Sequence, residues 1–189
     1  MTKEMPNSKE GSNRYVAFLR GINVGGHKVI PMEELRTLFE SMGFKNVKTL
    51  LASGNVVFDA KKAQPYSMGE EIGQSLENRF GYRVGIIVRS INDIQKLVTA
   101  NPFKKIAVTP ATRLYVTFLP TKQKRTLKKI QLSAGRGIDV LSVSAGEVCT
   151  AVIVVPGEGT PQLMGFLEKE FGKEITTRNW NTICKVAEA

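Results

Sequence analysis

The sequence predicts an α+β protein in which a unit of the order strand–helix–strand–strand–helix–strand occurs twice. Short apolar runs rich in Val, Phe and Tyr indicate strands, and apolar residues at helical spacing between them indicate helices. A further observation is that the same order of elements returns after residue 100. The chain has 189 residues, 42% of them hydrophobic, a size that fits one domain or two small subdomains sharing a core.

The first unit has its strands where four apolar runs occur, at residues 14–19, 47–52, 55–60 and 82–89. Its first helix is expected between Pro31 and Gly43, because Pro fits the first helical position and Gly commonly ends a helix. Its second helix is expected to open at a capping box made by Ser67 and Glu70, and to end at Gly81. These signals together define one complete unit.

The second unit repeats this order after a bridging helix that opens at Ser90. Its strand-like runs are residues 113–119, 138–144, 147–155 and 174–178. A basic helix with Leu127 and Ile130 on one face is expected after the first run, and a second helix begins at Thr160-Pro161. Asn179 is expected to cap an additional helix at the C-terminal end.

Two such units correspond to the split arrangement of ferredoxin-like folds. We therefore expect duplicated ferredoxin-like (βαββαβ) subdomains with antiparallel sheets and an extra C-terminal helix. The expected boundaries are a disordered tail at 1–13, subdomain 1 with the bridging helix at 14–100, and subdomain 2 with the C-terminal helix at 101–189. The two subdomains are expected to pack together as one body, because a bare sheet face needs a partner.

The net charge of +10 is concentrated in the middle of the chain. No acidic residue lies between Asp93 and Asp139, while ten Lys and Arg residues do. One interpretation is a solvent-exposed helix face. The alternative is a surface for sequence-tolerant binding of nucleic acid within residues 96–136. The side chains expected to carry that binding are Lys122, Lys124, Arg125, Lys128 and Lys129.

Composition excludes several other classes of protein and site. No apolar run approaches the roughly 20 residues of a membrane-spanning helix, and the first thirteen residues lack a signal-peptide core. Cys149 and Cys184 do not form a close pair, so a reduced, cytoplasmic setting is expected. With His27 as the single histidine, we expect no metal site and no cofactor.

The most unusual local sequence is the Gly-rich segment at residues 20–28. It lies between a strand and the start of a helix, where backbone N–H groups and the helix dipole can hold an anion. It does not match a Walker loop or a dinucleotide-binding fingerprint. The alternative is a demanding turn that needs glycine. The candidate ligand-binding residues here are Arg20, Asn23, Gly25, Gly26 and Lys28.

Two further polar motifs contribute candidate residues. Ser53 and Asn55 flank a tight turn at Gly54, and the turn alone explains their residue types. If the first and third strands run antiparallel, this turn shares one end of the sheet with the Gly-rich segment. Near the C-terminal end, Arg178 is suited to bidentate pairing with phosphate or carboxylate. Asn179 joins it as a candidate, although a helix cap is the alternative for that residue.

These three motifs also carry a resemblance to a known family. With Arg20-Gly-Ile-Asn-Val-Gly-Gly, Ser53-Gly-Asn and Thr177-Arg-Asn-Trp-Asn-Thr, the chain resembles the bacterial domain-of-unknown-function family DUF1697 over about residues 14–188. Pro31-Met32 and Asn101-Pro102-Phe103 also match, whereas Leu51-Ala52 stands where a more polar pair is expected. The resemblance implies a duplicated α+β body with two ferredoxin-like subdomains. It implies no reaction, cofactor or partner.

The leading hypothesis is a cytoplasmic binding module for a small anionic or nucleotide-like ligand. Its anion would pair with Arg20 and Arg178, with the other candidate residues orienting the ligand. Nucleic-acid binding through residues 96–136 is the second hypothesis. The third is an enzyme of unknown reaction that uses His27 or Arg178, although the sequence contains no recognisable catalytic constellation. The oligomeric state is left open.

Overall fold

The computed structural model describes residues 12–24, 29–61, 63–120, 133–134, 137–154 and 163–189. Within these residues the helices are α1 (Met32–Ser41), α2 (Pro65–Phe80), α3 (Ile91–Ala100), α4 (Leu163–Phe171) and α5 (Trp180–Ala187). The strands are β1 (Ser12–Leu19), β2 (Lys45–Leu50), β3 (Asn55–Lys61), β4 (Ile86–Ser90), β5 (Thr112–Phe118), β6 (Ser133–Ala134), β7 (Ile138–Val143), β8 (Glu147–Ile153) and β9 (Thr176–Asn179). The predicted α+β class is confirmed.

The strands form two antiparallel sheets, which we call the first and the second sheet. The first has the order β2-β3-β1-β4, and the second has the order β6-β7-β8-β5-β9. The first strand of each set is central: β1 lies between β3 and β4, and β5 lies between β8 and β9. Both sheets therefore place corresponding strands in the same order, apart from the added β6.

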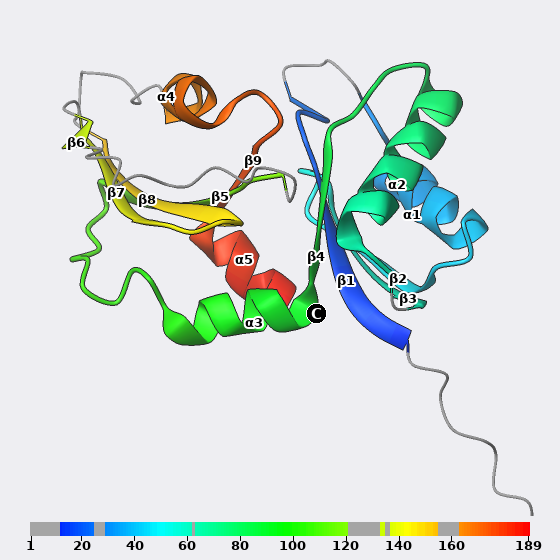
Figure 1. Cartoon of the computed structure of the whole chain (residues 1–189), viewed down its shortest axis with the longest axis horizontal. Helices are drawn as coiled ribbons and strands as arrows, with labels where there is room; N and C mark the ends of the chain where they lie inside the picture. The colour runs from blue at the N-terminus through cyan, green and yellow to red at the C-terminus, as the bar shows by residue number, and fades with distance from the viewer. Residues whose placement is uncertain (1–11, 25–28, 62, 121–132, 135–136, 155–162) are drawn as a thin grey trace, which may run out of the picture.

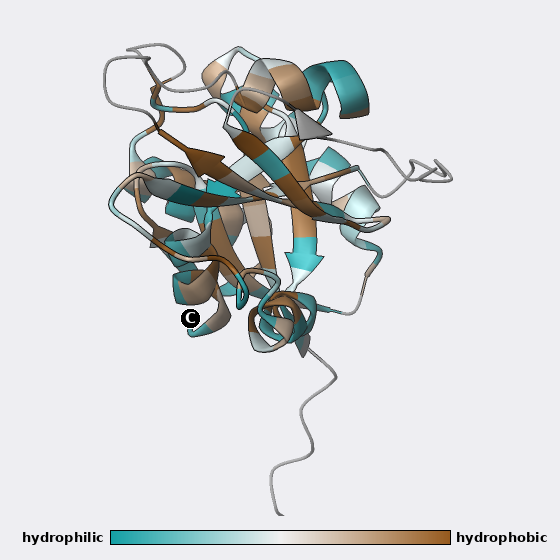
Figure 2. Ribbon diagram, turned by 90° about the vertical axis from the view of Figure 1, so that its left-hand side faces the viewer, coloured by the Kyte–Doolittle hydropathy of each residue, from teal (hydrophilic) through white to brown (hydrophobic). Residues whose placement is uncertain are grey.

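Among the described residues, three hydrophobic cores hold these layers together. Helices α1 and α2 cover one face of the first sheet, where Phe39, Phe58 and Leu76 are fully buried. Helix α4 covers a face of the second sheet through Leu167 and Phe171. The middle core joins side chains of β1, β4, β5, α3 and α5, and Figure 1 shows α3 and α5 lying together at one end of the two sheets. In Figure 2 the strands that pass through the middle core are mostly brown, the colour of hydrophobic residues.

The centre of the middle core is a contact between β1 and β5. The rings of Phe18 and Phe118 stack there with centroids 4.5 Å apart and planes 12° from parallel. Both rings are essentially inaccessible to solvent. Because this core belongs to both sheets, burial at the contact stabilises the two together.

The helix boundaries follow most of the expected signals. Ser90 accepts a hydrogen bond from the backbone N–H of Asp93, and Asn179 accepts one from that of Thr182, so both predicted caps are confirmed. The predicted start at Ser67 is wrong: α2 begins at Pro65, since Pro at the first turn gives up a hydrogen bond that the helix lacks there anyway. The predicted basic helix and residues 1–11 of the predicted tail lie outside the described residues, whereas residues 12 and 13, which were assigned to the tail, begin β1.

Candidate functional site

Arg178 lies between the two sheets and is only 9% exposed. From β9, its guanidinium reaches the end of β1 and the turn between β2 and β3. Its Nε donates to Asn55 Oδ1 at 2.6 Å, and its Nη1 donates to Thr176 Oγ1 and to the carbonyl of Thr177. Its Nη2 donates to the carbonyls of Leu19, Ser53 and Gly54, at 2.5, 3.1 and 3.3 Å. All three nitrogens therefore have protein acceptors.

Asn55 and Ser53 belong to the same hydrogen-bonded group. Asn55 is fully buried, and its Nδ2 donates to the carbonyl of Leu50 and to Ser53 Oγ. Its amide thus closes the β2–β3 turn with one end and orients Arg178 with the other. The structure therefore brings together Arg178, Asn55 and Ser53, as an internal cross-link. Anion binding by these residues stays a prediction, and an anion at Arg178 has to replace one of the existing acceptors.

Arg89 makes the reciprocal connection from the first sheet to the second. From β4, its Nη2 donates to the carbonyls of Leu119 and Gly146, at 2.5 and 3.1 Å. Its Nη1 donates to the carbonyl of its neighbour Val88 at 2.9 Å. The carbonyls of Leu119 and Gly146 correspond to those of Leu19 and Gly54, since each pair also shares a backbone hydrogen bond, Leu19 N to Gly54 O and Leu119 N to Gly146 O.

A phenylalanine ring lies beside the guanidinium of each arginine as well. The guanidinium of Arg178 lies 5.5 Å from the ring centroid of Phe18, and that of Arg89 lies 5.7 Å from that of Phe118. Each arginine is followed by a capping residue and a helix, α5 after Arg178 and α3 after Arg89. The two arginines are therefore equivalent parts of one pattern.

The two arginines differ in how fully they are bonded. Where Arg178 meets Asn55 and Thr176, the matching positions beside Arg89 hold Glu147 and Ile87. Across the described parts of the chain, Nε of Arg89 has no acceptor, and no carboxylate oxygen lies within 4 Å of its guanidinium. Burial lowers the pKa of Arg89, while the negative charges of Glu147 and Asp93 partly oppose that effect. Burial alone lowers the pKa of Arg178 to about 10.

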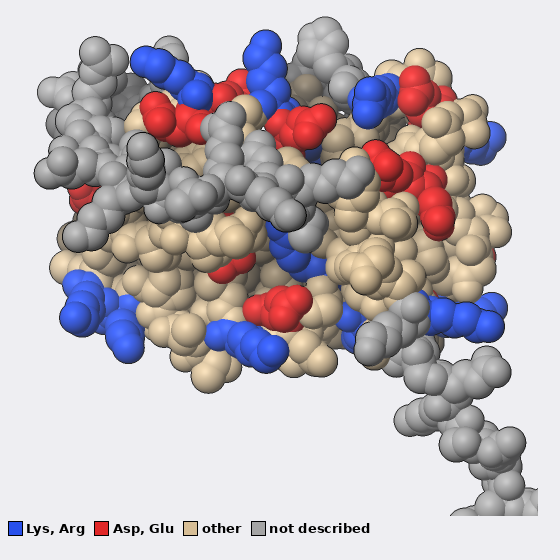
Figure 3. Space-filling model, viewed as in Figure 1, with Lys and Arg blue, Asp and Glu red and all other residues tan. Residues whose placement is uncertain are grey.

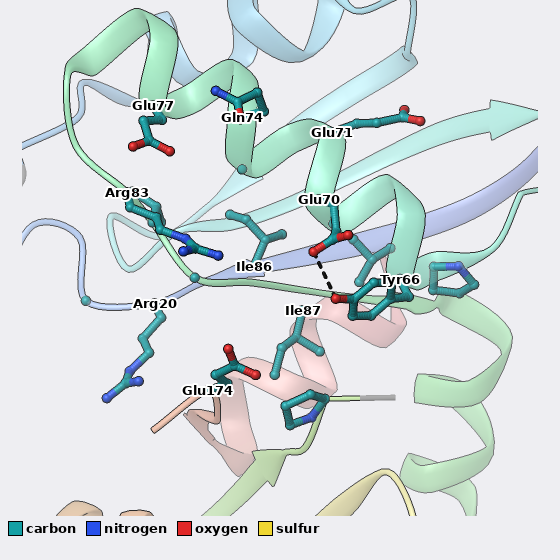
Figure 4. Close-up of a pocket in the computed structure, with 18 of the residues that line it drawn as sticks. Arg20, Tyr66, Glu70, Glu71, Gln74, Glu77, Arg83, Ile86, Ile87 and Glu174 are labelled. Carbon is teal, nitrogen blue, oxygen red and sulfur yellow. Dashed lines mark hydrogen bonds between the residues drawn. The ribbon is translucent and has the colours of Figure 1, made fainter. Parts of the chain in front are cut away.

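A cleft of about 1010 Å³ runs along β4, and we call it the β4 cleft. Its floor is formed by residues 84–89, one wall by α2, and the other wall by Pro120 with the loop between α4 and β9. Arg20 and Arg89 both line it. Figure 4 shows the α2 side chains above β4 and Glu174 below it, on the opposite wall.

Arg20 is the predicted site residue that lies in this cleft. It follows β1, and its Nη2 pairs with Glu168 Oε1 of α4 at 2.5 Å, so its charge already has one partner. Its backbone N–H donates to the carbonyl of Gly85. The guanidinium of Arg20 therefore pairs with Glu168 and takes no part in the hydrogen bonds described around Arg178, with which it was expected to share an anion.

The remaining predicted site residues are held locally or lie outside the described residues. Asn23 has a φ of 56°, and its side chain binds the backbone of Ile30 and the carbonyl of Ala52, so it ties the base of the Gly-rich segment to the β2–β3 turn. Asn179 is exposed and caps α5. Residues not described are Gly25, Gly26, His27 and Lys28 of the Gly-rich segment, and Lys122, Lys124, Arg125, Lys128 and Lys129 of the basic segment.

Sequence reasoning missed Arg89 and the acidic wall of α2. A signal for Arg89 was present, because residues 15–19 (YVAFL) and 115–119 (YVTFL) differ at one position, and an arginine precedes the capping residue in both halves. The glutamates of α2 were visible only as helix-surface residues, since their position opposite β4 depends on the fold.

Within the described residues, no group of three His, Cys, Asp or Glu side chains has the geometry of a metal site.

The fold and the paired arginines define an α+β protein whose two sheets are linked by reciprocal guanidinium contacts. The chain belongs to the family described as protein of unknown function (DUF1697), whose model matches residues 12–148. Arg178 and its motif lie beyond that matched region.

A solved structure supports the fold over almost the whole chain. The conserved bacterial protein SP0830 from Streptococcus pneumoniae is similar with a TM-score of 0.69 and 19% sequence identity, covering 94% of this chain and 98% of that one. At this identity the similarity concerns the fold alone. No curated protein matches the chain. None of the described helices is both long and apolar enough to cross a lipid bilayer.

Proposed function

We propose that this protein binds a small anionic ligand, of which a nucleotide-like molecule is one class, in the β4 cleft. The observation that carries the proposal is Arg89, which lines the cleft and keeps Nε without an acceptor among the described residues. Partly buried charges are normally neutralised by a partner, and here no carboxylate of the described chain supplies one at contact distance. A phosphate or carboxylate of a ligand would complete this environment.

The cleft supports this proposal in size and in the side chains near Arg89. Its volume of about 1010 Å³ is at the upper end of the range for small-molecule sites. Arg20 and Lys173 line the same cleft as Arg89, and both Arg89 and Arg20 bond to residues of the second half, Arg89 to Leu119 and Gly146 and Arg20 to Glu168. In this proposal the cleft-lining arginines bind the ligand, and Arg178 with Asn55 keeps the two sheets in position.

We also propose that the two halves are duplicated ferredoxin-like subdomains, with boundaries near residues 14–100 and 101–189. The equal order of corresponding strands supports this, as do the reciprocal contacts of Arg89 and Arg178. A cytoplasmic location belongs to the same proposal.

No observation favours the nucleic-acid alternative, since its five basic side chains lie outside the described residues.

The test is a thermal-shift screen of nucleotides, phosphorylated metabolites and dicarboxylates. A ligand at one hundred times its dissociation constant is expected to stabilise the protein by about 2.7 kcal/mol. Arg89→Met should abolish that shift. Arg113→Met is the matched control, because Arg113 is exposed on β5 and also bonds only to backbone carbonyls. The proposal fails if no compound gives a shift, or if the shift persists unchanged in Arg89→Met.

A further inference from the structure

The β4 strand is the terminal strand of the first sheet, and the direction of its backbone groups follows from its register. Arg20 N donates to Gly85 O, so that pair is hydrogen-bonded, and bonded pairs then alternate along the two strands. Ile87 and Arg89 direct their N–H and C=O groups to β1, whereas Ile86 and Val88 direct theirs outward. A Cβ placed on Gly69 of α2 would lie 3.4 Å from Ile86 O, and one on Gly73 would lie 3.7 Å from Val84 O, so α2 packs closely against these two carbonyls.

The outward edge of β4 forms the floor of the cleft. All residues from 84 to 89 line it, although alternate side chains of a strand point to opposite faces, so the cleft follows the backbone edge itself. Val88 O already accepts from Arg89, whereas the outward N–H groups of Ile86 and Val88 meet no further strand in the described structure. These are groups to which the carbonyls of an added strand bind.

The two walls of the cleft continue the two faces of the first sheet. The Ile86 and Val88 side chains pack in the core beneath α1 and α2, while Ile87 packs in the middle core toward the second sheet. A strand added beside β4 would therefore direct its side chains alternately toward α2 and toward the second sheet. The floor of six residues is about 20 Å long at 3.3 Å per residue.

The two walls differ in charge, although Arg20 already pairs with Glu168. The α2 wall presents Glu70, Glu71 and Glu77, and Figure 4 shows the first two along the helix above β4. The opposite wall presents Arg20, Arg89 and Lys173. One side chain of the other sign accompanies each set, Arg83 beside α2 and Glu174 opposite. On the wider surface in Figure 3, basic and acidic side chains are interspersed.

We propose that the β4 cleft binds an extended peptide that adds to β4 as a further strand, with basic side chains toward α2 and acidic side chains toward Arg20, Arg89 and Lys173. The peptide backbone supplies carbonyls to the outward N–H groups of Ile86 and Val88. The alternating charges match the two walls, which gives the site its register. The inference rests on the proposed function in one respect, that the anionic group of the ligand binds at Arg89.

The experiment measures fluorescence anisotropy of a labelled seven-residue peptide of alternating Lys and Glu, capped at both ends, on the full chain. Its block isomer, with the lysines and glutamates separated, should bind at least ten-fold more weakly. An analogue with N-methylated alternate amides should show a similar loss, because it cannot pair with a strand edge. Glu71→Lys should weaken binding at least ten-fold. Glu33→Lys, an equal change of charge on exposed α1, should leave binding unchanged.

The outcomes separate the two proposals. Equal binding of the alternating and block peptides, or no effect of N-methylation, would overturn strand addition, since charge attraction alone would then suffice. If small anions bind in an Arg89-dependent manner while no peptide does, the proposed function stands and the strand proposal falls. If neither small anions nor peptides show dependence on Arg89, both proposals are wrong.

Discussion

Arg178 and Arg89 hold matching positions in the two halves of this protein, but their surroundings differ. Both reach from a terminal strand to a carbonyl at the C-terminal end of the opposite central strand, Leu19 at the end of β1 or Leu119 just after β5, and to a hairpin glycine. Arg178 additionally contacts two polar side chains, Asn55 and Thr176. Arg89 has Glu147 and Ile87 at those places, with no hydrogen bond to either, and lines an open cleft. Equivalent backbone positions therefore hold an arginine whose three nitrogens are all hydrogen-bonded in one half, and an arginine that is only partly hydrogen-bonded in the other.

This difference is our reason for proposing a ligand site at Arg89 and not at Arg178. Buried arginine donors contribute to stability when every donor and acceptor is paired, and breaking such a contact leaves several polar groups without partners. The group around Arg178 satisfies that condition within the protein. Arg89 satisfies it only in part, so a ligand can bind there without displacing a protein acceptor. In our proposal, Arg178 only links the two sheets, whereas Arg89 both links them and binds the ligand.

The largest expected effect comes from replacing Arg178, whose three nitrogens all have acceptors within the protein. Arg178→Met should lower the free energy of unfolding by about 3–5 kcal/mol, because it leaves the oxygens of Asn55, Thr176 and Leu19 buried without a donor. Arg89→Met should cost about 1–2 kcal/mol, since it releases only backbone carbonyls at the edge of a cleft. Urea denaturation of both variants measures the difference. Equal losses would show that the shared carbonyls, and not the side-chain partners of Arg178, carry the stability.

The hairpin glycines provide a second comparison of the halves. Gly54 has a φ of +75°, and a Cβ there would lie 2.8 Å from Leu19 Cβ and from Ile22 Cδ1. Gly54→Ala should therefore destabilise the protein by about 3 kcal/mol, through overpacking and left-handed backbone strain. Gly146→Ala should cost less than about 0.5 kcal/mol, since the nearest atom to its Cβ is Arg89 Nη2 at 3.8 Å. Thermal unfolding of the two variants tests this, and a larger loss for Gly146→Ala would contradict the assigned difference in packing around the two glycines.

Local sequence signals predicted the elements of the fold well, for physical reasons visible at particular residues. Apolar runs identified β1, β3, β5 and β8, because each lies in the centre of a sheet and is buried. The caps at Ser90 and Asn179 were predicted because a side-chain oxygen and a backbone N–H three residues away form a local interaction. Ser67 failed because Pro65 provides a competing start for α2 two residues earlier.

The site was less accessible to sequence reasoning because its contacts are long-range. Arg178 meets Asn55 across 123 positions of the chain and Leu19 across 159. The motif types were sufficient to mark these residues as unusual, but not to distinguish an internal guanidinium contact from an exposed anion site. Asn23 shows the same limit: its amide is suited to a ligand, yet the fold uses it to join two loops. Burial decides between the two, and it depends on both halves.

The smallest expected effect concerns a contact that exists in one half alone. Arg14 of β1 donates to Asp59 Oδ1 at 2.7 Å, whereas the matching positions in the second sheet are Leu114 and Ala151. Burial alone would raise the pKa of Asp59, but hydrogen bonds from Asn46 and Arg14, with the charge of Arg14, outweigh it and hold the pKa below its usual value. The carboxylate therefore stabilises the folded state above the usual pKa, near pH 4, and this contribution disappears as the pH falls through the lower folded-state pKa.

This pH dependence can be measured against a matched variant. The difference in free energy of unfolding between the natural protein and Asp59→Asn should be about 0.5 kcal/mol larger at pH 6 than at pH 2, a small value because the ion pair is partly solvated. Comparing the two proteins removes the pH effects that they share, including the repulsion among the many basic side chains. Arg14→Met should reduce the same difference, because one of the groups that stabilise the charged carboxylate is then missing. If the difference is instead larger at pH 2, the pKa of Asp59 is raised on folding, and burial then dominates over the two hydrogen bonds.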